Sequence, residues 1–527
     1  MKRILCMLVS VGLIFGLAVT AIAGDPVYGG TAIVASHSSP DTLDLHVTTA
    51  RAAQVNAGIY IFEGLAGFDE GSSVRPMLAK SWEFSEDLMT CTFYLREGVL
   101  FHDGSTFDAE DVIASIARFR EVSPGASRLD IVTSITAPDP LTVVFVCSEP
   151  FGTLPETLCS EGYNVAIFPS EIASAMPAAG QIDIIGTGPY KLVNWIPGTE
   201  IVMERFEDYA ADDDPASGFV GFKGAYLDKI IWKQVPEEEI RFAGLQTGDF
   251  QVAQPLPGDY VDRIVAAEGQ GIALRTFTDM KPYVYLSVQP DSPLADPRMR
   301  QALRMAIDYD EVMYAATTSE SRYFVNTDQL QFQSQTCWDP TIMAGVADQN
   351  DKAGAKALAE STGYSMSRGD PDNKPIVFLA SIKSFHHRRP ALELAEQWKA
   401  AGFNIELQLK DWAVVIATLP EWDKWDIWYA RQTYFNYGHY AGLASGGYDS
   451  PAFQDILSEM RMNTDPDALC GLLVRFREEV LIADCPVINF GDMFGVGAQV
   501  ANLKNVGNAV QSGYYSYLAN AWLEVDD

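Results

Sequence analysis

Histidine and basic side chains are scarce in this chain of 527 residues. It has six histidines, and its 37 lysines and arginines stand against 70 aspartates and glutamates, for a formal net charge of −33. Such a chain repels nucleic acid and anionic membrane surfaces. Because the acidic residues are dispersed, we interpret them as a solubilising surface, and we expect no nucleic-acid partner.

Catalytic motifs are also missing. The sequence has no GxSxG, HExxH, Walker A or dinucleotide-binding pattern. The only adjacent histidines are His386 and His387, and neighbouring residues on a helix or strand point in different directions. We interpret this pair as surface residues at a helix start rather than as metal ligands. We therefore expect a protein that is not an enzyme and that has no catalytic residues, metal or cofactor.

Only one long hydrophobic run is present, and it lies at the amino terminus. Lys2 and Arg3 precede an apolar run from Ile4 to Val19, which is followed by Ala21-Ile22-Ala23. This is the pattern of a secretory signal peptide, here residues 1–23. Cys6 precedes most of the apolar run, so we expect cleavage after Ala23 rather than lipid attachment. The sequence thus predicts a soluble periplasmic protein with about 35 basic and 70 acidic residues after cleavage.

Six cysteines remain after that cleavage, and none shows CxxC spacing. An oxidising compartment permits them to pair, whereas a chain of this length needs no disulfide framework. The sequence leaves open whether they form bridges or stay as buried thiols. They are Cys91, Cys147, Cys159, Cys337, Cys470 and Cys485.

The first third of the chain is typical of short strands. Val27 to Val34 is interpreted as an edge strand. Between residues 63 and 183, apolar residues alternate with others over Cys91 to Leu95 and again over Leu141 to Phe145, which indicates half-buried strands. Asp108 is a candidate N-cap for a helix. This region is predicted to be a small α+β unit.

Strands and helices alternate in the last third. We predict strands at Ile376 to Ala380, Phe403 to Leu409 and Asp426 to Ala430, with helices at Pro390 to Ala401 and Trp412 to Leu419. Such alternation indicates parallel β-α-β units and an α/β fold. No long low-complexity linker is present, so the lobes are expected to be joined by strand crossings.

Several blocks of the sequence carry a family resemblance. The chain resembles the family 5 extracellular solute-binding proteins, which are the dipeptide, oligopeptide and nickel receptors of ABC importers. The longest blocks are Pro76 to Glu83, Thr92 to Gly104 and Asp108 to Val112, and the shorter ones are Ile61 to Leu65, Gly186 to Tyr190, Asp296 to Leu303 and Pro486 to Ile488.

The resemblance implies a two-lobed α/β periplasmic binding protein with an extra α+β domain inserted in the first lobe and a ligand cleft between the lobes. Together with the pattern changes, it predicts a discontinuous lobe I of residues 24–62, 184–276 and 490–527. The inserted domain would be 63–183, and lobe II would be 277–489. Closure on a hinge around the ligand would present the loaded form to the permease.

The resemblance also suggests ligand-binding residues. In peptide-binding relatives, the stretch after the strand at Ile427 to Ala430 carries an aspartate that holds the peptide's amino terminus, and Tyr437 stands in its place here. A buried ammonium without an anionic partner is costly, so an ordinary peptide fits less well. Arg431 matches a family pocket arginine that could grip a carboxylate or phosphate, although an internal salt bridge is the alternative.

The same resemblance suggests further residues of the ligand cleft. Trp412, Tyr434 and His387 match cleft positions by spacing, and Ser38 lies in a loop that borders the cleft in relatives. For Trp412 the alternative is core packing. The predicted function is capture of a small peptide-like or carboxylate-bearing solute by a monomer that meets the membrane only through ABC permease subunits. The alternatives are a nickel or metallophore receptor, a secreted hydrolase and a sensory binding protein.

Overall fold

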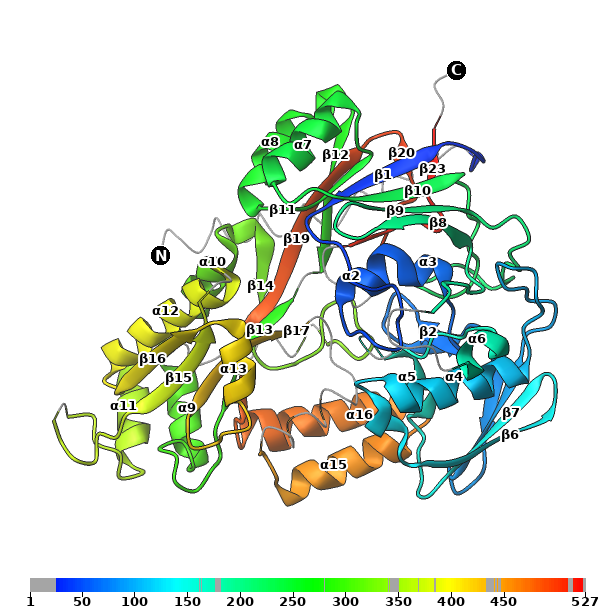
Figure 1. Ribbon diagram of the computed structural model, residues 1–527. Helices are drawn as coiled ribbons and strands as arrows, with labels where there is room; N and C mark the ends of the chain where they lie inside the picture. Colours follow the sequence, from blue (N-terminus) through cyan, green and yellow to red (C-terminus); the bar gives the residue numbers. More distant parts are fainter. Residues whose placement is uncertain are drawn as a thin grey trace.

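A computed structural model shows how these segments are arranged (Figure 1). It describes residues 25–160, 162, 164–175, 182–278, 280–339, 341, 350–367, 369–382, 385–432, 440, 443, 447–509 and 515–524. The predicted signal peptide therefore lies outside the described residues. Within those ranges, no helix combines the length and the apolar character that a membrane span requires.

An eight-stranded sheet forms what we call lobe I. Its order is β12-β19-β11-β1-β10-β9-β8, and a further strand, β14, pairs with β19. The strands are β1 (Thr31–Ser36), β8 (Tyr190–Ile196), β9 (Glu200–Arg205), β10 (Lys229–Gln234), β11 (Val252–Leu256), β12 (Ile272–Thr278), β14 (Tyr323–Val325) and β19 (Gly491–Val500). Its helices are α2 (Arg51–Ala53), α3 (Ile59–Ile61), α7 (Glu238–Thr247) and α8 (Val261–Ala266), with π-helix η1 (Gln54–Gly58) and the 3-10 turns η3 (Gly258–Tyr260) and η4 (Glu268–Gln270).

A five-stranded sheet forms lobe II. Its order is β16-β15-β17-β13-β18, with helices on both faces. The strands are β13 (Lys281–Leu286), β15 (Ile376–Ser381), β16 (Ile405–Lys410), β17 (Ile427–Gln432) and β18 (Val487–Asn489). The helices are α9 (Pro297–Met305), α10 (Tyr309–Thr317), η5 (Glu320–Arg322), α11 (Lys352–Glu360), α12 (Phe385–Ala401), α13 (Trp412–Thr418), α15 (Pro451–Met462), α16 (Pro466–Phe476) and η7 (Arg477–Ile482).

A four-stranded antiparallel sheet with its own core forms the part that we call the insert. Its order is β4-β5-β7-β6. The strands are β4 (Ala79–Phe84), β5 (Thr90–Leu95), β6 (Val132–Asp139) and β7 (Thr142–Cys147), beside the short pair β2 (Ala66–Phe68) and β3 (Val74–Pro76). Its helices are α4 (Ala109–Val122), η2 (Ala126–Leu129), α5 (Leu154–Cys159) and α6 (Ser170–Ser174). Two short pairs close the chain: β20 (Leu503–Lys504) with β23 (Trp522–Leu523), and β21 (Gly507–Asn508) with β22 (Ser516–Tyr517).

Much of the local prediction is confirmed. Strand β15 pairs in parallel with β16 and β17, as the alternation of strands and helices predicted. In β5, Cys91, Phe93 and Leu95 are buried while their neighbours are half-buried. Asp108 caps α4 in a reciprocal capping box with Asp111, which satisfies backbone donors that the first turn leaves unpaired.

Two predictions about element positions are wrong. Strand β1 is not at an edge, because it lies in parallel between β10 and β11. Its neighbours are remote in sequence, so the local pattern did not show them. The helix expected from Pro390 begins five residues earlier, at Phe385. Pro390 lies inside the helix, which forgoes one backbone hydrogen bond there because proline lacks an amide proton, so it did not mark the first residue.

Strand crossings join the two lobes, as the sequence predicted. Strand β12 of lobe I ends at Thr278 and β13 of lobe II begins at Lys281; β18 of lobe II ends at Asn489 and β19 of lobe I begins at Gly491. In Figure 1, β19 runs from lobe I down to the junction with lobe II. Lys281 and Asp492, one from each crossing, form a buried ion pair. The two connections are thus clamped to each other by opposite charges.

The cysteines divide into one bridge and four thiols. Cys337 and Cys470, 133 residues apart, form a disulfide that ties the segment after β14 to α16. The other cysteines within the described residues, Cys91, Cys147, Cys159 and Cys485, are free and buried. Both outcomes that the sequence left open, a disulfide bridge and buried free thiols, therefore occur in this protein.

A buried ion pair joins lobe I to the insert. Arg118 of α4 donates two hydrogen bonds to the carboxylate of Asp44, at 3.0 and 2.6 Å, and neither side chain is exposed. His46 lies beside them, with its Nε2 2.8 Å from the Ala166 carbonyl oxygen. Burial lowers the pKa of His46 to about 4, and the charge of Arg118 adds to this effect.

Because the folded pKa of His46 is lowered, its contribution to stability is complete above pH 6.5 and is lost as the pH falls from about 6.5 to about 4. Unfolding at pH 5 therefore takes up a proton at this residue. We expect the His46→Gln variant to take up about one proton fewer on unfolding at pH 5. Denaturant unfolding between pH 4 and 8 measures this, and equal pH slopes for both proteins would contradict it.

Candidate functional site

Strand β17 and two helix starts bring five side chains together at one edge of the lobe II sheet. We call these residues the Arg431 cluster: Arg431, His386, His387, Trp412 and Tyr429. The His387 ring centre lies 5.5 Å from the ring centres of both Trp412 and Tyr429. Tyr429 and Arg431 are two residues apart on β17, so their side chains share one face of the sheet.

The charge of Arg431 dominates the electrostatics of this cluster. Burial lowers the pKa of His387 to about 3 and that of His386 to about 2, and Arg431 is in each case the next largest cause. Arg322 lowers the pKa of His386 further. Both imidazoles are therefore neutral at physiological pH, and guanidinium groups carry the positive charge. Within a chain of net charge −33, this arrangement favours an anionic ligand group.

Arg322 anchors this side of the molecule near the lobe junction. Its Nε donates to the Phe494 carbonyl of β19 at 3.1 Å, and its Nη1 donates to the Thr317 carbonyl of α10 at 3.0 Å. The guanidinium packs closely on Gly258 of lobe I, where any side chain would collide with it. A lobe II arginine thereby contacts lobe I directly through a glycine.

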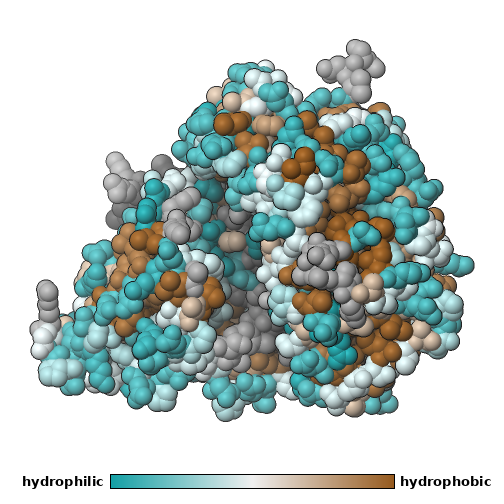
Figure 2. Space-filling view, viewed as in Figure 1, coloured by the Kyte–Doolittle hydropathy of each residue, from teal (hydrophilic) through white to brown (hydrophobic). Residues whose placement is uncertain are grey.

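Three of the six predicted ligand-binding residues meet in this cluster: Arg431, His387 and Trp412. Ser38 lies elsewhere, in the loop after β1, where its carbonyl accepts a hydrogen bond from Asn56 at 3.3 Å. Tyr434 and Tyr437 lie outside the described residues, so their predicted roles stay predictions. Figure 2 shows the surface hollowed between the half that carries α12 and α13 and the half that carries α2 and α3.

One alternative interpretation is wrong. Core packing does not explain Trp412, because 45% of its surface is exposed whereas Val415, one turn further along α13, is fully buried. His386 and His387 lie in the first turn of α12, as expected, but both are partly buried, and His386 Nδ1 lies 2.9 Å from the Ala316 carbonyl oxygen. Trp412 thus contacts the His387 ring while nearly half of its surface stays exposed.

The sequence interpretation missed Tyr429, His386 and Arg322. Tyr429 had a usable signal, because residues two apart on a strand face the same way and Arg431 was already a candidate. His386 is adjacent to the candidate His387, whereas Arg322 had no signal, since the effect of its charge on His386 depends on the packing of η5 against distant segments. No group of three or more potential metal ligands occurs among the residues that the structure places.

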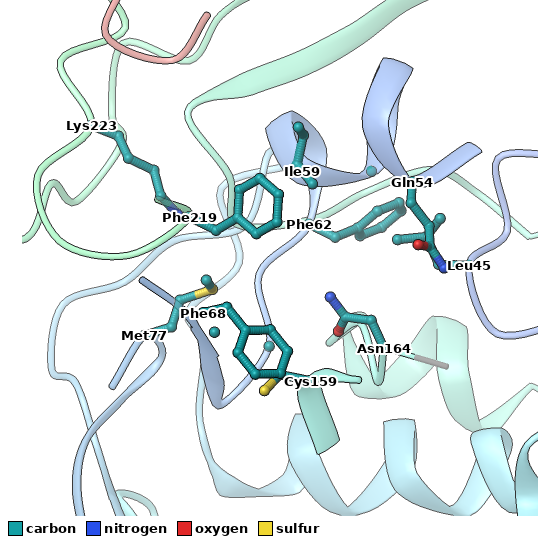
Figure 3. Close-up of a pocket in the computed structure, with 13 residues that line it drawn as sticks. Leu45, Gln54, Ile59, Phe62, Phe68, Met77, Cys159, Asn164, Phe219 and Lys223 are labelled. Atoms are coloured by element: carbon teal, nitrogen blue, oxygen red, sulfur yellow. The ribbon is translucent and has the colours of Figure 1, made fainter. Parts of the chain in front are cut away.

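A cavity apart from the Arg431 cluster lies between lobe I and the insert (Figure 3). It is small, about 50 Å³, and its wall is largely apolar, with Phe62, Phe68 and Phe219 on different sides. The Lys223 ammonium is 2.6 Å from Glu63 in a buried ion pair, so its charge is already compensated. This space is better explained as a packing gap at a domain junction than as the solute site.

An exposed aromatic ring beside a cationic cluster gives a direct test. Replacement of Trp412 by alanine should weaken solute binding about three- to tenfold, because the ring supplies apolar contact area at the edge of the cluster. Since the ring is half exposed, the free energy of unfolding should change little. Calorimetry measures the affinity, and Val414→Ala, an exposed position on the same helix, is the matched control. Equal affinities for the two variants would remove Trp412 from the site.

Two α/β lobes joined by strand crossings, with a polar cluster at their junction, define a hinged solute-binding protein. Residues 73–454 match the family described as bacterial extracellular solute-binding proteins, family 5 Middle, and the chain belongs to this family. It is thus an extracytoplasmic substrate-binding protein of an ABC importer, a class that binds small solutes and works with permease subunits.

Known proteins of this kind align over most of the chain. A probable peptide ABC transporter periplasmic-binding protein of Sinorhizobium fredii is 26% identical over 72% of this chain and 70% of its own length. A glutathione-binding protein of Salmonella paratyphi A is 28% identical over 72% and 69%. The solved structure of NikA from Brucella suis in complex with Fe(III)-EDTA has a TM-score of 0.76 at 18% identity, covering 94% of this chain and all of NikA.

Proposed function

We propose that this protein captures a small peptide-like solute through a carboxylate that Arg431 binds, and that closure of the lobes delivers it to the permease. The observation that carries the proposal is the position of Arg431 beside two imidazoles that burial and its own charge keep neutral. A carboxylate placed there gains a charge-assisted, bidentate partner.

The relatives support a solute of this class. Their names specify a peptide and glutathione, both of which carry carboxylates. The substitution of Tyr437 for the aspartate of peptide-binding relatives removes the partner of a free amino terminus. We therefore propose that the carboxylate end, rather than the ammonium end, of the solute determines affinity.

The proposal includes the course of binding. The open form would take up the solute at the Arg431 cluster, and contacts from the Ser38 loop of lobe I would form only on closure. The ligand stabilises the closed state to the extent that it makes these additional contacts. The strand crossings supply the hinge, because short extended connections absorb a rotation with small changes of φ and ψ.

We also propose how the chain is exported and divided into domains. The chain would be exported with residues 1–23 as a cleavable signal and would act in the periplasm as a monomer without enzymatic activity. Lobe I would comprise 24–62, 184–276 and 490–527, the inserted domain 63–183, and lobe II 277–489. Three separate sheets support a division into three parts, although β14 lies within the proposed lobe II range and pairs with β19 of lobe I.

A set of matched ligands tests the proposal. Mass spectrometry of solutes released from natively purified protein should identify a carboxylate-bearing compound. For a peptide-like solute, calorimetry should show that the C-terminal amide binds at least about tenfold more weakly than the acid, whereas N-acetylation changes the affinity less than about threefold. Strong binding of the amide together with loss of binding on acetylation would overturn the assignment.

A further inference from the structure

A larger cavity of about 220 Å³ lies between the insert and lobe II. On the insert side it is bounded by β3, β4 and the start of α5, and on the lobe II side by the segment after β14 and by α15 and α16. In Figure 1, α15 and α16 lie directly below the lobe junction, next to α5. The residues of the Arg431 cluster do not line this cavity.

The wall combines apolar and polar side chains in similar numbers. Its apolar residues include Trp82, Phe84, Met460, Leu469 and Leu473. A purely apolar cavity of roughly 150 Å³ accepts benzene, so this space is large enough for an aromatic ring or a branched chain. A bound group of this kind would be withdrawn from water on several sides.

One polar group on the wall, the Thr153 hydroxyl, lacks a hydrogen-bond partner within the described part of the chain. The Thr153 side chain is only 8% exposed, and its hydroxyl has no hydrogen-bond partner among the residues that the structure describes. A buried hydroxyl without a partner costs free energy, which a ligand with a donor or acceptor would recover. Glu156 and Asp465 also line the space, and no lysine or arginine does so among the described residues. The chemistry therefore disfavours an anion.

Covalent and hydrogen-bonded links hold the two walls in place. Cys337 lines the cavity, and its disulfide to Cys470 fixes that segment to α16. The Thr336 amide donates to the Gly71 carbonyl at 2.9 Å, and the hydroxyls of Thr336 and Ser73 are 2.8 Å apart. The cavity is thus bounded by contacts between two domains, so an occupant would touch both.

The same segment is attached to the hinge. The amide of Gln333 donates to the carboxylate of Asp492 at 3.2 Å, and Asp492 is the partner of Lys281 in the buried ion pair between the strand crossings. Gln331 and Gln335, on either side of Gln333, line the cavity. A molecule in the cavity therefore contacts the segment whose backbone binds the hinge carboxylate.

We propose that this cavity is a second binding site, separate from the Arg431 cluster, for a small molecule with an aromatic or branched apolar group and a neutral or positively charged polar end. The apolar group occupies the space between Trp82 and Leu473, and the polar end bonds to the Thr153 hydroxyl. Since the occupant contacts both the insert and lobe II, it stabilises the arrangement in which these two parts touch.

Three matched probes test the site on the full mature protein: 2-phenylethylamine, 2-phenylethanol and 3-phenylpropionate. They share a ring and a two-carbon chain and differ in charge. Calorimetry or ligand-observed NMR should give a Kd below about 1 mM for the amine and the alcohol and binding at least about tenfold weaker for the carboxylate. Absence of binding by the amine and the alcohol, or tighter binding by the carboxylate, would overturn the proposal.

Two variants locate the probe. Thr153→Val keeps the shape and removes the hydroxyl, so the amine should bind about fivefold more weakly, whereas Thr133→Val, at an exposed threonine of the insert, should leave its affinity unchanged. Leu473→Trp should fill the space and abolish binding while the solute of the Arg431 cluster still binds. If 2-phenylethylamine no longer binds to Arg431→Ala but still binds to Leu473→Trp, the probe occupies the Arg431 cluster and the assignment is refuted.

Discussion

Replacement of Asp492 by asparagine is expected to lower the free energy of unfolding by about 3–5 kcal/mol, because it leaves the Lys281 ammonium buried without a counter-charge. Neither side chain of this pair is more than 1% exposed. Burial lowers the pKa of Lys281, and the charge of Asp492 opposes that shift. Removing the carboxylate therefore destabilises the charged lysine within the hinge itself. Denaturant unfolding measures the loss.

The matched control is an ion pair at the surface. Lys356 and Glu360 lie 3.8 Å apart one turn along α11, with about half of each side chain exposed, so Glu360→Gln should cost less than about 0.5 kcal/mol. Combined replacement of Lys281 by methionine and Asp492 by leucine should recover part of the stability, because no buried charge is left unpaired. A small effect of Asp492→Asn alone would contradict the expected cost of an unpaired buried charge.

Loss of the Arg431 guanidinium is expected to weaken binding of the anionic solute by at least about tenfold, or about 1.4 kcal/mol. Arg431 is the charge that acts on both imidazoles of the cluster, so the Arg431→Ala variant removes the main attraction for a carboxylate. Arg431→Lys keeps the charge but lacks the planar pair of donors, so its affinity should lie between those of the unchanged protein and Arg431→Ala. Calorimetry with the solute identified by mass spectrometry gives the affinities.

Arg388 provides the control for this change. It lies next to His387 in the first turn of α12, and its side chain is exposed. Arg388→Ala removes an equal charge from a neighbouring exposed position and should change affinity less than about twofold, because exposed charges are screened. The two arginines having equal effects would indicate general attraction of the anion rather than a defined contact. Unchanged affinity in Arg431→Ala would remove Arg431 from the site.

Local chemistry made much of the fold predictable from the sequence. The alternation of Cys91, Phe93 and Leu95 and the cap at Asp108 depend on residues a few positions apart, so their signals are contained in short windows. The same holds for Asp296, whose carboxylate accepts from the Arg298 amide at the start of α9. Resemblance to a family then supplied the lobe arrangement that short windows cannot give.

The remaining features depend on contacts between distant segments. The interior position of β1 requires β10 and β11, which follow roughly 200 residues later. The partner of Cys337 is 133 residues away. At the site, Arg431 and Trp412 were found by spacing, whereas His386 joins them only because α12 begins before its proline. Such features arise from tertiary packing, for which one sequence holds no local pattern.

The place of β19 in the lobe I sheet has a consequence for the order in which the chain can fold. This strand, Gly491–Val500, lies between β11 and β12, which come more than 200 residues before it. Until β19 is available, β12 has no partner among the described strands of this sheet and β11 lacks its neighbour on that side. Completion of the lobe I sheet therefore depends on contacts of long sequence separation, which form slowly.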